Sequence, residues 1–247
     1  MTDPASIFAR TPDLDPARVQ SLVSESLTGC DDGELYLQYS ASESFGFDDG
    51  RLKTAAFDSG QGFGLRGVSG ETTGFAHAND LSEAGIRRAA ETVRLVAEGR
   101  GGVLAAPPAR TNVHLYTDDN PLNLVPFARK VALCQDIDAA ARARDPRVAQ
   151  VSVGLSGSWS VVEIVRPDGF TARDIRPLVR LNVSIVVEQN GRRETGFHGL
   201  GGRWLYDRLF EAETWNRAID VALAQALVNL DSVAAPAGEM TVVLGPG

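Results

Sequence analysis

The sequence predicts an α+β fold, in which antiparallel meander sheets are flanked by helices and two related α-β-β-β-α halves follow one another. Three observations support this prediction. Apolar residues alternate with period two over several stretches, they recur at helical spacing over four others, and the same order of elements occurs twice. With 247 residues and 43% hydrophobic content, the chain is long enough to bury a sizeable core.

The first half is predicted to open with a helix over residues 15–28. Its apolar residues lie on one helical face, and Asp15 before Pro16 is typical of a helix start, because a carboxylate accepts free N–H groups there. The further elements predicted for this half are a hairpin around Asp49-Gly50, strands over 62–69 and 72–76, and a helix over 82–97.

The second half is predicted to repeat this order. Its predicted elements are a helix over 124–142, strands over 148–155, 159–165 and 178–188, a turn at Asp168-Gly169, and a last helix over 211–230. The segment ETTGF at Glu71–Phe75 is echoed by ETGF at Glu194–Phe197, each before a helix. This echo indicates an internal duplication.

The Gly- and Pro-rich stretch from Gly99 to Pro108 is predicted to link the halves, because these residues disfavour regular structure. We therefore expect a first α+β half over 1–105, a second over 106–235, and a closing segment over 236–247. Within this last segment, Met240 to Leu244 is predicted to be a strand, the first of a further domain.

Composition narrows the functional classes. Twenty-four Lys and Arg against 32 Asp and Glu give a net charge of −8, which disfavours direct nucleic-acid binding. No signal peptide and no run of 18 apolar residues is found, so no membrane association is expected. Cys30 and Cys134 are far apart in sequence and outside any CxxC motif, so no disulfide framework is expected. A cytoplasmic location fits this cysteine usage best.

Two motifs suggest chemistry but lack its context. Gly62 to Gly67 matches GxGxxG, yet a dinucleotide fingerprint must open a helix, and here strand and turn residues follow, so a bent strand is predicted. His77, His114 and His198 are too far apart in sequence for an HExxH site. We therefore predict no catalytic residue, no metal ligand and no cofactor within this chain.

The segment GFHGLGGR at residues 196–203 is predicted to be a loop between a strand and a helix. Four glycines expose the backbone, which allows close approach of another chain. The candidate residues for peptide or partner contact are His198, Gly199, Gly201, Gly202 and Arg203. A plain connecting loop is the structural alternative, with the glycines in a tight turn and Arg203 paired with a nearby acid.

Three long segments, Tyr36–Ala76, Asp174–Arg203 and Gly238–Gly247, resemble in the same order the N-terminal region of the TldD/PmbA family. The resemblance implies zinc-dependent peptidases, once described as modulators of DNA gyrase. It further implies unfolded substrates, such as antitoxins and microcin precursors, and pairing with a sister subunit or self-association. The family's metal helix, HExxxH, begins just after the segment matched here by VVLGPG. Zinc is thus expected in the full-length protein, and this chain is expected to be inactive alone.

Two alternatives remain beside a non-catalytic part of a metalloprotease. One is a stand-alone module that binds extended peptides at a sheet edge without hydrolysis. The other, a gyrase-binding or DNA-binding protein, is disfavoured by the negative charge. The reading frame after Gly247 distinguishes the part of a metalloprotease from the stand-alone module. An immediate HExxxH motif favours the peptidase, and a stop codon favours the module.

Overall fold

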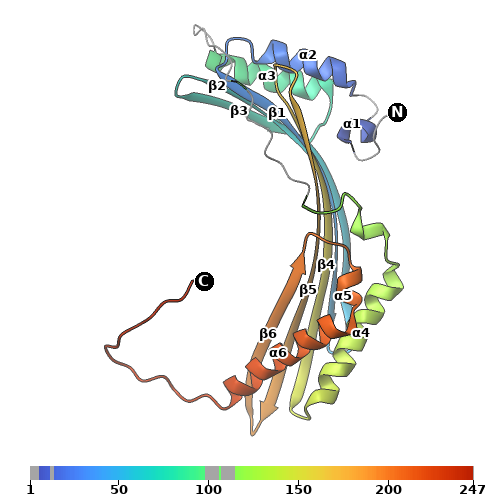
Figure 1. Cartoon of the computed structure of the whole chain (residues 1–247), viewed down its shortest axis with the longest axis vertical. Coiled ribbons are helices and arrows are strands. Elements are labelled where there is room, and N and C mark those ends of the chain that lie inside the picture. Colours follow the sequence, from blue (N-terminus) through green and yellow to red (C-terminus); the bar gives the residue numbers. More distant parts are fainter. Residues whose placement is uncertain (1–5, 12–13, 98–105, 107–114, 247) are drawn as a thin grey trace.

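The computed structural model describes residues 6–11, 14–97, 106 and 115–246. Strands of this described part form one antiparallel sheet in the order β3-β2-β1-β4-β5-β6 (Figure 1). The strands are β1 (Asp32–Asp48), β2 (Arg51–Ser69), β3 (Thr72–Ala78), β4 (Val148–Val165), β5 (Thr171–Gln189) and β6 (Arg192–Gly202). The helices are α1 (Ile7–Arg10), α2 (Pro16–Ser26), α3 (Glu83–Ala97), the 3-10 helix η1 (Pro121–Asn123), α4 (Phe127–Arg144), α5 (Asp207–Phe210) and α6 (Ala212–Leu230).

The predicted fold class is confirmed, and so is the repeated order of elements. The meander β1-β2-β3 lies between α2 and α3 in sequence, and the meander β4-β5-β6 lies between α4 and α6. The halves join where β1 pairs antiparallel with β4 in the middle of the sheet. The boundaries given to the halves stay a prediction, and the proposed linker at 99–108 falls largely outside the described residues.

Strand lengths differ from the prediction. Residues 62–69 are only the end of the 19-residue β2, and the two strands expected at 148–155 and 159–165 form the single 18-residue β4. Glycine residues do not interrupt these strands, because backbone hydrogen bonds to the neighbouring strands keep the chain extended. In β5, Pro177 lies beyond the last residue paired with β6, Val179, so its missing N–H removes no bond on that side.

The predicted strand from Met240 to Leu244 is wrong for this structure. Residues 232–246 of the described chain form neither helix nor strand, and Val243 and Leu244 are 90% and 88% exposed. A strand needs a neighbour to pair with its N–H and C=O groups. None of the described strands pairs with this segment.

Turn and cap chemistry follows the sequence closely. Asp15 caps α2 by accepting from the Arg18 N–H at 2.9 Å. The β1–β2 turn places Asp49 and Gly50 at positive φ, as a type I′ hairpin requires. The β5–β6 hairpin uses the corresponding pair Asn190-Gly191, which the sequence analysis did not single out.

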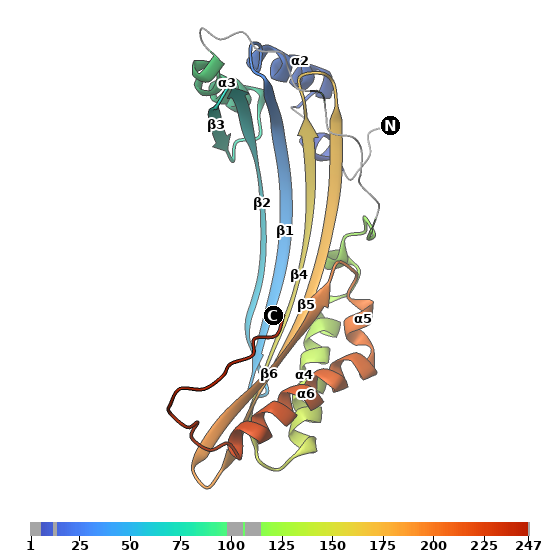
Figure 2. The same cartoon turned by 60° about the vertical axis from the view of Figure 1, so that its left-hand side comes forward.

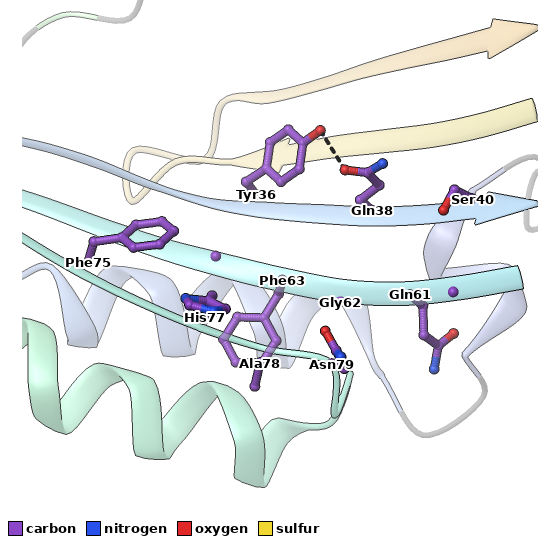
Figure 3. Close-up of a pocket in the computed structure, with 12 residues that line it drawn as sticks. Tyr36, Gln38, Ser40, Gln61, Gly62, Phe63, Phe75, His77, Ala78 and Asn79 are labelled. Atoms are coloured by element: carbon purple, nitrogen blue, oxygen red, sulfur yellow. Dashed lines mark hydrogen bonds between the residues drawn. The ribbon is translucent and has the colours of Figure 1, made fainter. Parts of the chain in front are cut away.

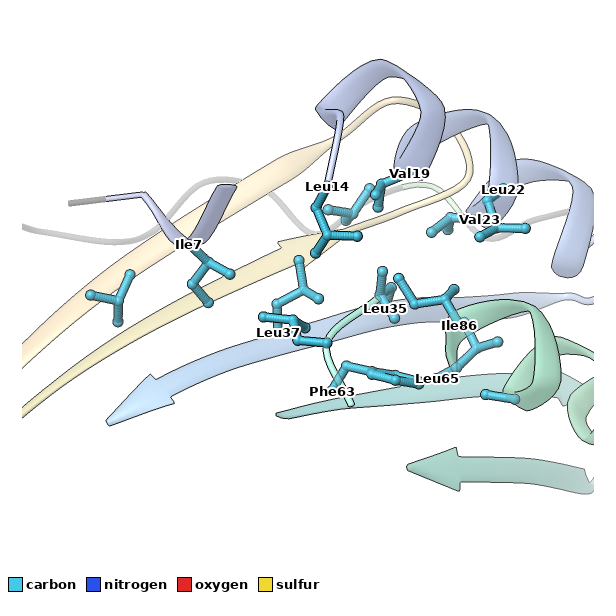
Figure 4. Packing of buried hydrophobic residues seen from close by; sticks show 14 of the residues in the cluster. Ile7, Leu14, Val19, Leu22, Val23, Leu35, Leu37, Phe63, Leu65 and Ile86 are labelled. Atoms are coloured by element: carbon cyan, nitrogen blue, oxygen red, sulfur yellow. The ribbon is translucent and has the colours of Figure 1, made fainter. Parts of the chain in front are cut away.

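The helices of the described residues all lie on one face of the sheet, which we call the helix face, and leave the other face open. Odd-numbered residues of β1 supply both hydrophobic cores: Leu35 and Leu37 pack below α2 and α3 (Figure 4), whereas Phe45 packs with α4 and α6. The sheet is curved, with the helices on its outer side (Figure 1). Figure 2 shows α2 and α3 at one end of the long strands and α4, α5 and α6 at the other. Cys30 lies in the first core and Cys134 in the second.

The glycine of each ETGF echo marks where a helix packs on an outer strand. Gly74 of β3 and Gly196 of β6 are both buried. At Gly196, a Cβ atom would collide with the backbone of α6 at Ala222 and Ala226. Helix packing therefore explains the glycine of the second segment, Gly196, since only a residue without a side chain lets the helix backbone approach this closely.

A buried lysine joins the two cores. Lys130 of α4 is 1% exposed; its Nζ lies 2.5 Å from Glu43 Oε1 of β1 and 2.9 Å from the carbonyl oxygen of Leu122. The ammonium also lies 4.8 Å from the ring centroid of Tyr206 and 5.8 Å from that of Phe45. This one group thus holds α4, β1, η1 and the residue before α5 together.

We expect Lys130→Met to lower the free energy of unfolding by about 3–5 kcal/mol, because it leaves the Glu43 carboxylate buried without its cation. The double variant Lys130→Met, Glu43→Met should recover most of this loss. Arg88→Met, which breaks an exposed pair with Asp80, is the control and should change stability by about 1 kcal/mol at most. Urea unfolding measures all three; a single lysine variant as stable as the wild type would contradict the role of Lys130.

We expect neither cysteine to react with iodoacetamide in the folded protein at mildly alkaline pH. Burial raises the pKa of Cys134 to about 11, and burial together with Asp31 raises the pKa of Cys30 above its ordinary value. Only the thiolate is nucleophilic, so both thiols stay unreactive until the chain unfolds. Mass spectrometry of alkylated protein with and without urea tests this; rapid native labelling of Cys134 would show that its core is open.

Candidate functional site

The segment GFHGLGGR, predicted as a loop, lies almost entirely in the outer strand β6. His198 pairs with Val183, Gly199 with Asn182, and Gly201 with Arg180 of β5. The prediction is wrong because glycine disfavours strands only weakly when a neighbouring strand supplies the ladder. The residues expected to contact a partner therefore line the edge of the sheet.

The chain itself explains the glycines. A Cβ atom on Gly201 would collide with the β5 backbone at Val179, and one on Gly202 would collide with the ring of Trp204. A Cβ on Gly199 would lie 2.7 Å from the Arg180 guanidinium. The close approach inferred from these glycines is thus made by their own chain, so their presence does not by itself point to a partner.

Arg203 stacks on an aromatic ring rather than pairing with an acid. Its guanidinium lies 5.3 Å from the ring centroid of Tyr116, whose hydroxyl donates to Asp174 Oδ1 at 3.0 Å. Burial is the main cause that raises the pKa of Tyr116, followed by the hydrogen bond to Asp174. Arg203 and Tyr116 together fasten the chain beside the part of β5 that β6 does not reach.

The glycine motif and the two described histidines lie within strands of the sheet. Gly62 to Gly67 lies inside β2, as expected for a bent strand. His77 is on β3 and His198 on β6, at opposite edges of the sheet, and His114 is outside the described residues. No three His, Cys, Asp or Glu side chains of the described part are arranged to hold a metal ion.

A cavity of about 460 Å³ lies on the open face, where β1, β2 and β3 run side by side (Figure 3). Tyr36 and Gln38 of β1, glycines of β2, and the stacked rings of Phe75 and His77 of β3, whose centroids are 5.6 Å apart, build it. Asn79, just after β3, closes one side. The cavity is thus walled by aromatic rings and floored by bare backbone.

Hydrogen bonds fix the polar groups of this cavity. The Tyr36 hydroxyl donates to Gln38 Oε1 at 3.1 Å, and the Gln38 amide donates to Ser160 Oγ at 3.3 Å. None of the lining residues is an aspartate, glutamate, lysine or arginine. The cavity therefore suits an apolar or aromatic group that offers one or two neutral hydrogen-bonding atoms.

The sequence analysis missed this cavity. Its signal was the glycines at alternate positions of β2, Gly60, Gly62 and Gly64; the sequence analysis interpreted the stretch from Gly62 to Gly67 only as a bent strand. Pairing places Gly62 beside Gln38 and Gly64 beside Tyr36. A run of glycines at alternate positions thus indicates a hollow on one face of a sheet.

The open face beyond the cavity is a floor of small polar side chains. Ser40, Ser42 and Ser44 of β1 pair with Ser160, Ser158 and Ser156 of β4. An ion-pair network lies at the far end of the cavity, where Arg66 contacts Glu34 and Asp32 at 2.6 Å each. The hydrogen bond to Glu34 is the main cause that raises the pKa of Arg66, so its charge is fixed.

No helix among the described residues combines the length and the hydrophobicity needed to cross a lipid bilayer.

Two family models match the chain. The model of the PmbA/TldA metallopeptidase domain 1 matches residues 33–97, and that of the PmbA/TldA metallopeptidase central domain matches residues 120–230. The first match runs from β1 to α3 and the second from η1 to α6.

Solved structures share the fold. A Bacteroides thetaiotaomicron protein described as a modulator of DNA gyrase superposes with a TM-score of 0.66 at 16% identity, over 85% of this chain and 50% of that one. A Thermotoga maritima protein described in the same way gives 0.64 at 13% identity, over 83% and 46%.

Curated relatives are closer in sequence. A metalloprotease TldD homologue of Haemophilus influenzae is 44% identical over 88% of this chain, and one of Buchnera aphidicola subsp. Schizaphis graminum is 36% identical over the same share. The chain spans 46% of the length of each. Matched by two models of one family and by these relatives, the chain belongs to the PmbA/TldD metallopeptidase family.

Proposed function

We propose that this chain is the non-catalytic N-terminal part of a TldD-like zinc metallopeptidase that cleaves unfolded peptides, and that it shapes the peptide cleft and a subunit interface. The observation that carries this proposal is the long open face of the sheet, with its floor of serines and its cavity. Relatives that bear the name metalloprotease are about twice as long as this chain.

The open face is suited to an extended chain of varied sequence. Serine hydroxyls both donate and accept hydrogen bonds, so they can meet a peptide backbone in either direction. Small side chains leave room above the sheet for side chains of different sizes. No three His, Cys, Asp or Glu side chains of the described residues could hold a metal ion, so the proposal assigns the zinc to the rest of the longer protein.

The outer strand β6 is proposed to contact a sister subunit or a second copy. The contact residues proposed there are His198, Gly199, Gly201, Gly202 and Arg203. Support comes from their place at the sheet edge, and from Phe197, which is 51% exposed on the open face. We further propose a cytoplasmic location, since both cysteines are free and buried.

The purified chain is expected to hold no stoichiometric zinc after dialysis, because a closed site needs four convergent ligands. Elemental analysis by mass spectrometry measures this. One zinc per chain that is lost on His77→Ala or on His198→Ala would contradict the proposal.

Cleavage is expected only from the longer protein. We expect β-casein to remain intact with the 247-residue chain and to be cut by a protein extended to the length of the Haemophilus relative, with activity lost in a chelator and restored by zinc. Gel analysis of timed digests decides it. Chelator-sensitive cleavage by the short chain would refute the non-catalytic role, and an inactive extended protein would favour the stand-alone peptide-binding module.

A further inference from the structure

The outer edge of β2 is open over a long stretch. Among the described residues, β3 pairs with β2 only from Phe63 to Ser69, so the outward N–H and C=O groups of residues 51–62 have no strand partner. Residues 51–60 are exposed on both faces, and Phe57 is 65% exposed. This edge is a template for a further strand.

Protection of this edge is weak. Natural edge strands avoid unwanted pairing with charges, proline or bulges. Between Thr54 and Gly62 the chain has no proline and one charged residue, Asp58, and the register shift in the β1–β2 ladder, at Gly46/Phe47, lies outside this stretch. The nine residues from Thr54 to Gly62 can therefore pair with an added strand. They span about 30 Å at roughly 3.3 Å per residue.

The equivalent edge in the second half is covered over more of its length, although residues 171–178 of β5 have no strand partner there among the described residues. There β6 pairs with 11 residues of β5, and beyond its end Tyr116 hydrogen-bonds to Asp174 and carries Arg203 on its ring. In the first half the inner strand has its partner β3 over only seven residues. The two halves share one topology, so the difference between their edges is specific to the first half.

The cavity lies at the point where this edge becomes free. Its lining includes Gly60, Gln61 and Gly62 of β2, together with Ala78 and Asn79 at the end of β3 (Figure 3). A strand added in line with β3 would therefore begin beside the cavity. One of its side chains would point into the space between Phe75 and Tyr36.

We propose that the edge Thr54–Gly62 binds an extended segment of an unfolded polypeptide, which adds a strand to the sheet and places one aromatic side chain in the cavity beside Tyr36 and His77. This proposal rests on the proposed function and names where the peptide first docks. Backbone pairing makes the site tolerant of sequence, and the cavity selects for one aromatic residue.

Charge favours a foreign segment over a second copy of the chain. Each copy carries a net charge of −8, so two copies repel, whereas a neutral or basic peptide does not. The edge adds only the single acid Asp58 between Thr54 and Gly62. The occupant we expect is thus a neutral or basic extended peptide.

The test uses a fluorescein-labelled octapeptide of alternating threonine and valine, with a lysine at one end and a phenylalanine near its centre. A matched peptide carries alanine in place of the phenylalanine. Fluorescence anisotropy with the 247-residue chain should give saturable binding, weakened about tenfold or more by the alanine, as expected for losing the burial of one aromatic ring.

Gly60→Leu is the variant that fills the cavity. A Cβ atom on Gly60 meets no atom within 4 Å, so the fold tolerates the change, and circular dichroism checks this. Ser59→Leu places the same side chain on the helix face of the same edge and is the control. We expect Gly60→Leu to weaken binding of the phenylalanine peptide about tenfold, to leave the alanine peptide unaffected, and Ser59→Leu to change neither more than about twofold.

Hydrogen exchange locates the contact. Amides of residues 54–62 should gain protection when the phenylalanine peptide binds. Protection confined to β6, equal binding of both peptides, or no saturable binding up to about 1 mM would each overturn the proposal. So would a dimer, seen by sedimentation, whose amides at 54–62 are protected without peptide. Casein cleavage by the extended protein does not depend on this result, so the two proposals fail separately.

Discussion

The buried ion pair between Lys130 and Glu43 is the interaction that connects the two ends of the sheet. Four strands of 17–19 residues span about 60 Å, whereas the longest helix, α6 with 19 residues, covers roughly 29 Å. Helices at both ends therefore build two separate cores. Lys130 joins them through Glu43 and the Leu122 carbonyl, and the Tyr206 ring closes over it. Burial, and next the charge of Glu43, raises the pKa of Tyr206, so the phenol stays neutral.

Because the helices are shorter than the strands, the middle of β2 is not covered by any described helix. Between the two cores the helix face of β2 has no helix above it, so Phe57, opposite Glu43 in the register, stays exposed. β3 ends before this region, at Ala78. The sheet thus has an open face, and β2 has an open edge and an exposed middle. All three follow from one arrangement, in which helices pack on the long strands only near their ends.

Sequence patterns predicted the fold class, the four long helices and the hairpin turn at Asp49-Gly50, because periodicity and turn chemistry are local. Strand lengths were beyond reach, since whether Gly157 or Pro177 interrupts a strand depends on what pairs beside it. The sites were harder for the same reason. Gly201 and Gly202 indicated close approach correctly, but the approaching groups are a β5 carbonyl and the Trp204 ring, which no sequence pattern places there. The cavity at Gly62 arises only when three strands come into register.

Departure from the internal symmetry is the strongest structural sign of function here. Both halves keep a meander, a hairpin turn at positive φ, and a buried glycine on the outer strand. They differ where stability requires nothing, at the free edge of the inner strand. In the second half, Tyr116 and Arg203 lie beside the edge of β5. In the first half, the edge of β2 has no such neighbours and leads to the cavity. An uncovered edge invites aggregation, so the long free edge of β2, beside the better covered edge of β5, is better explained by an occupant than by packing alone.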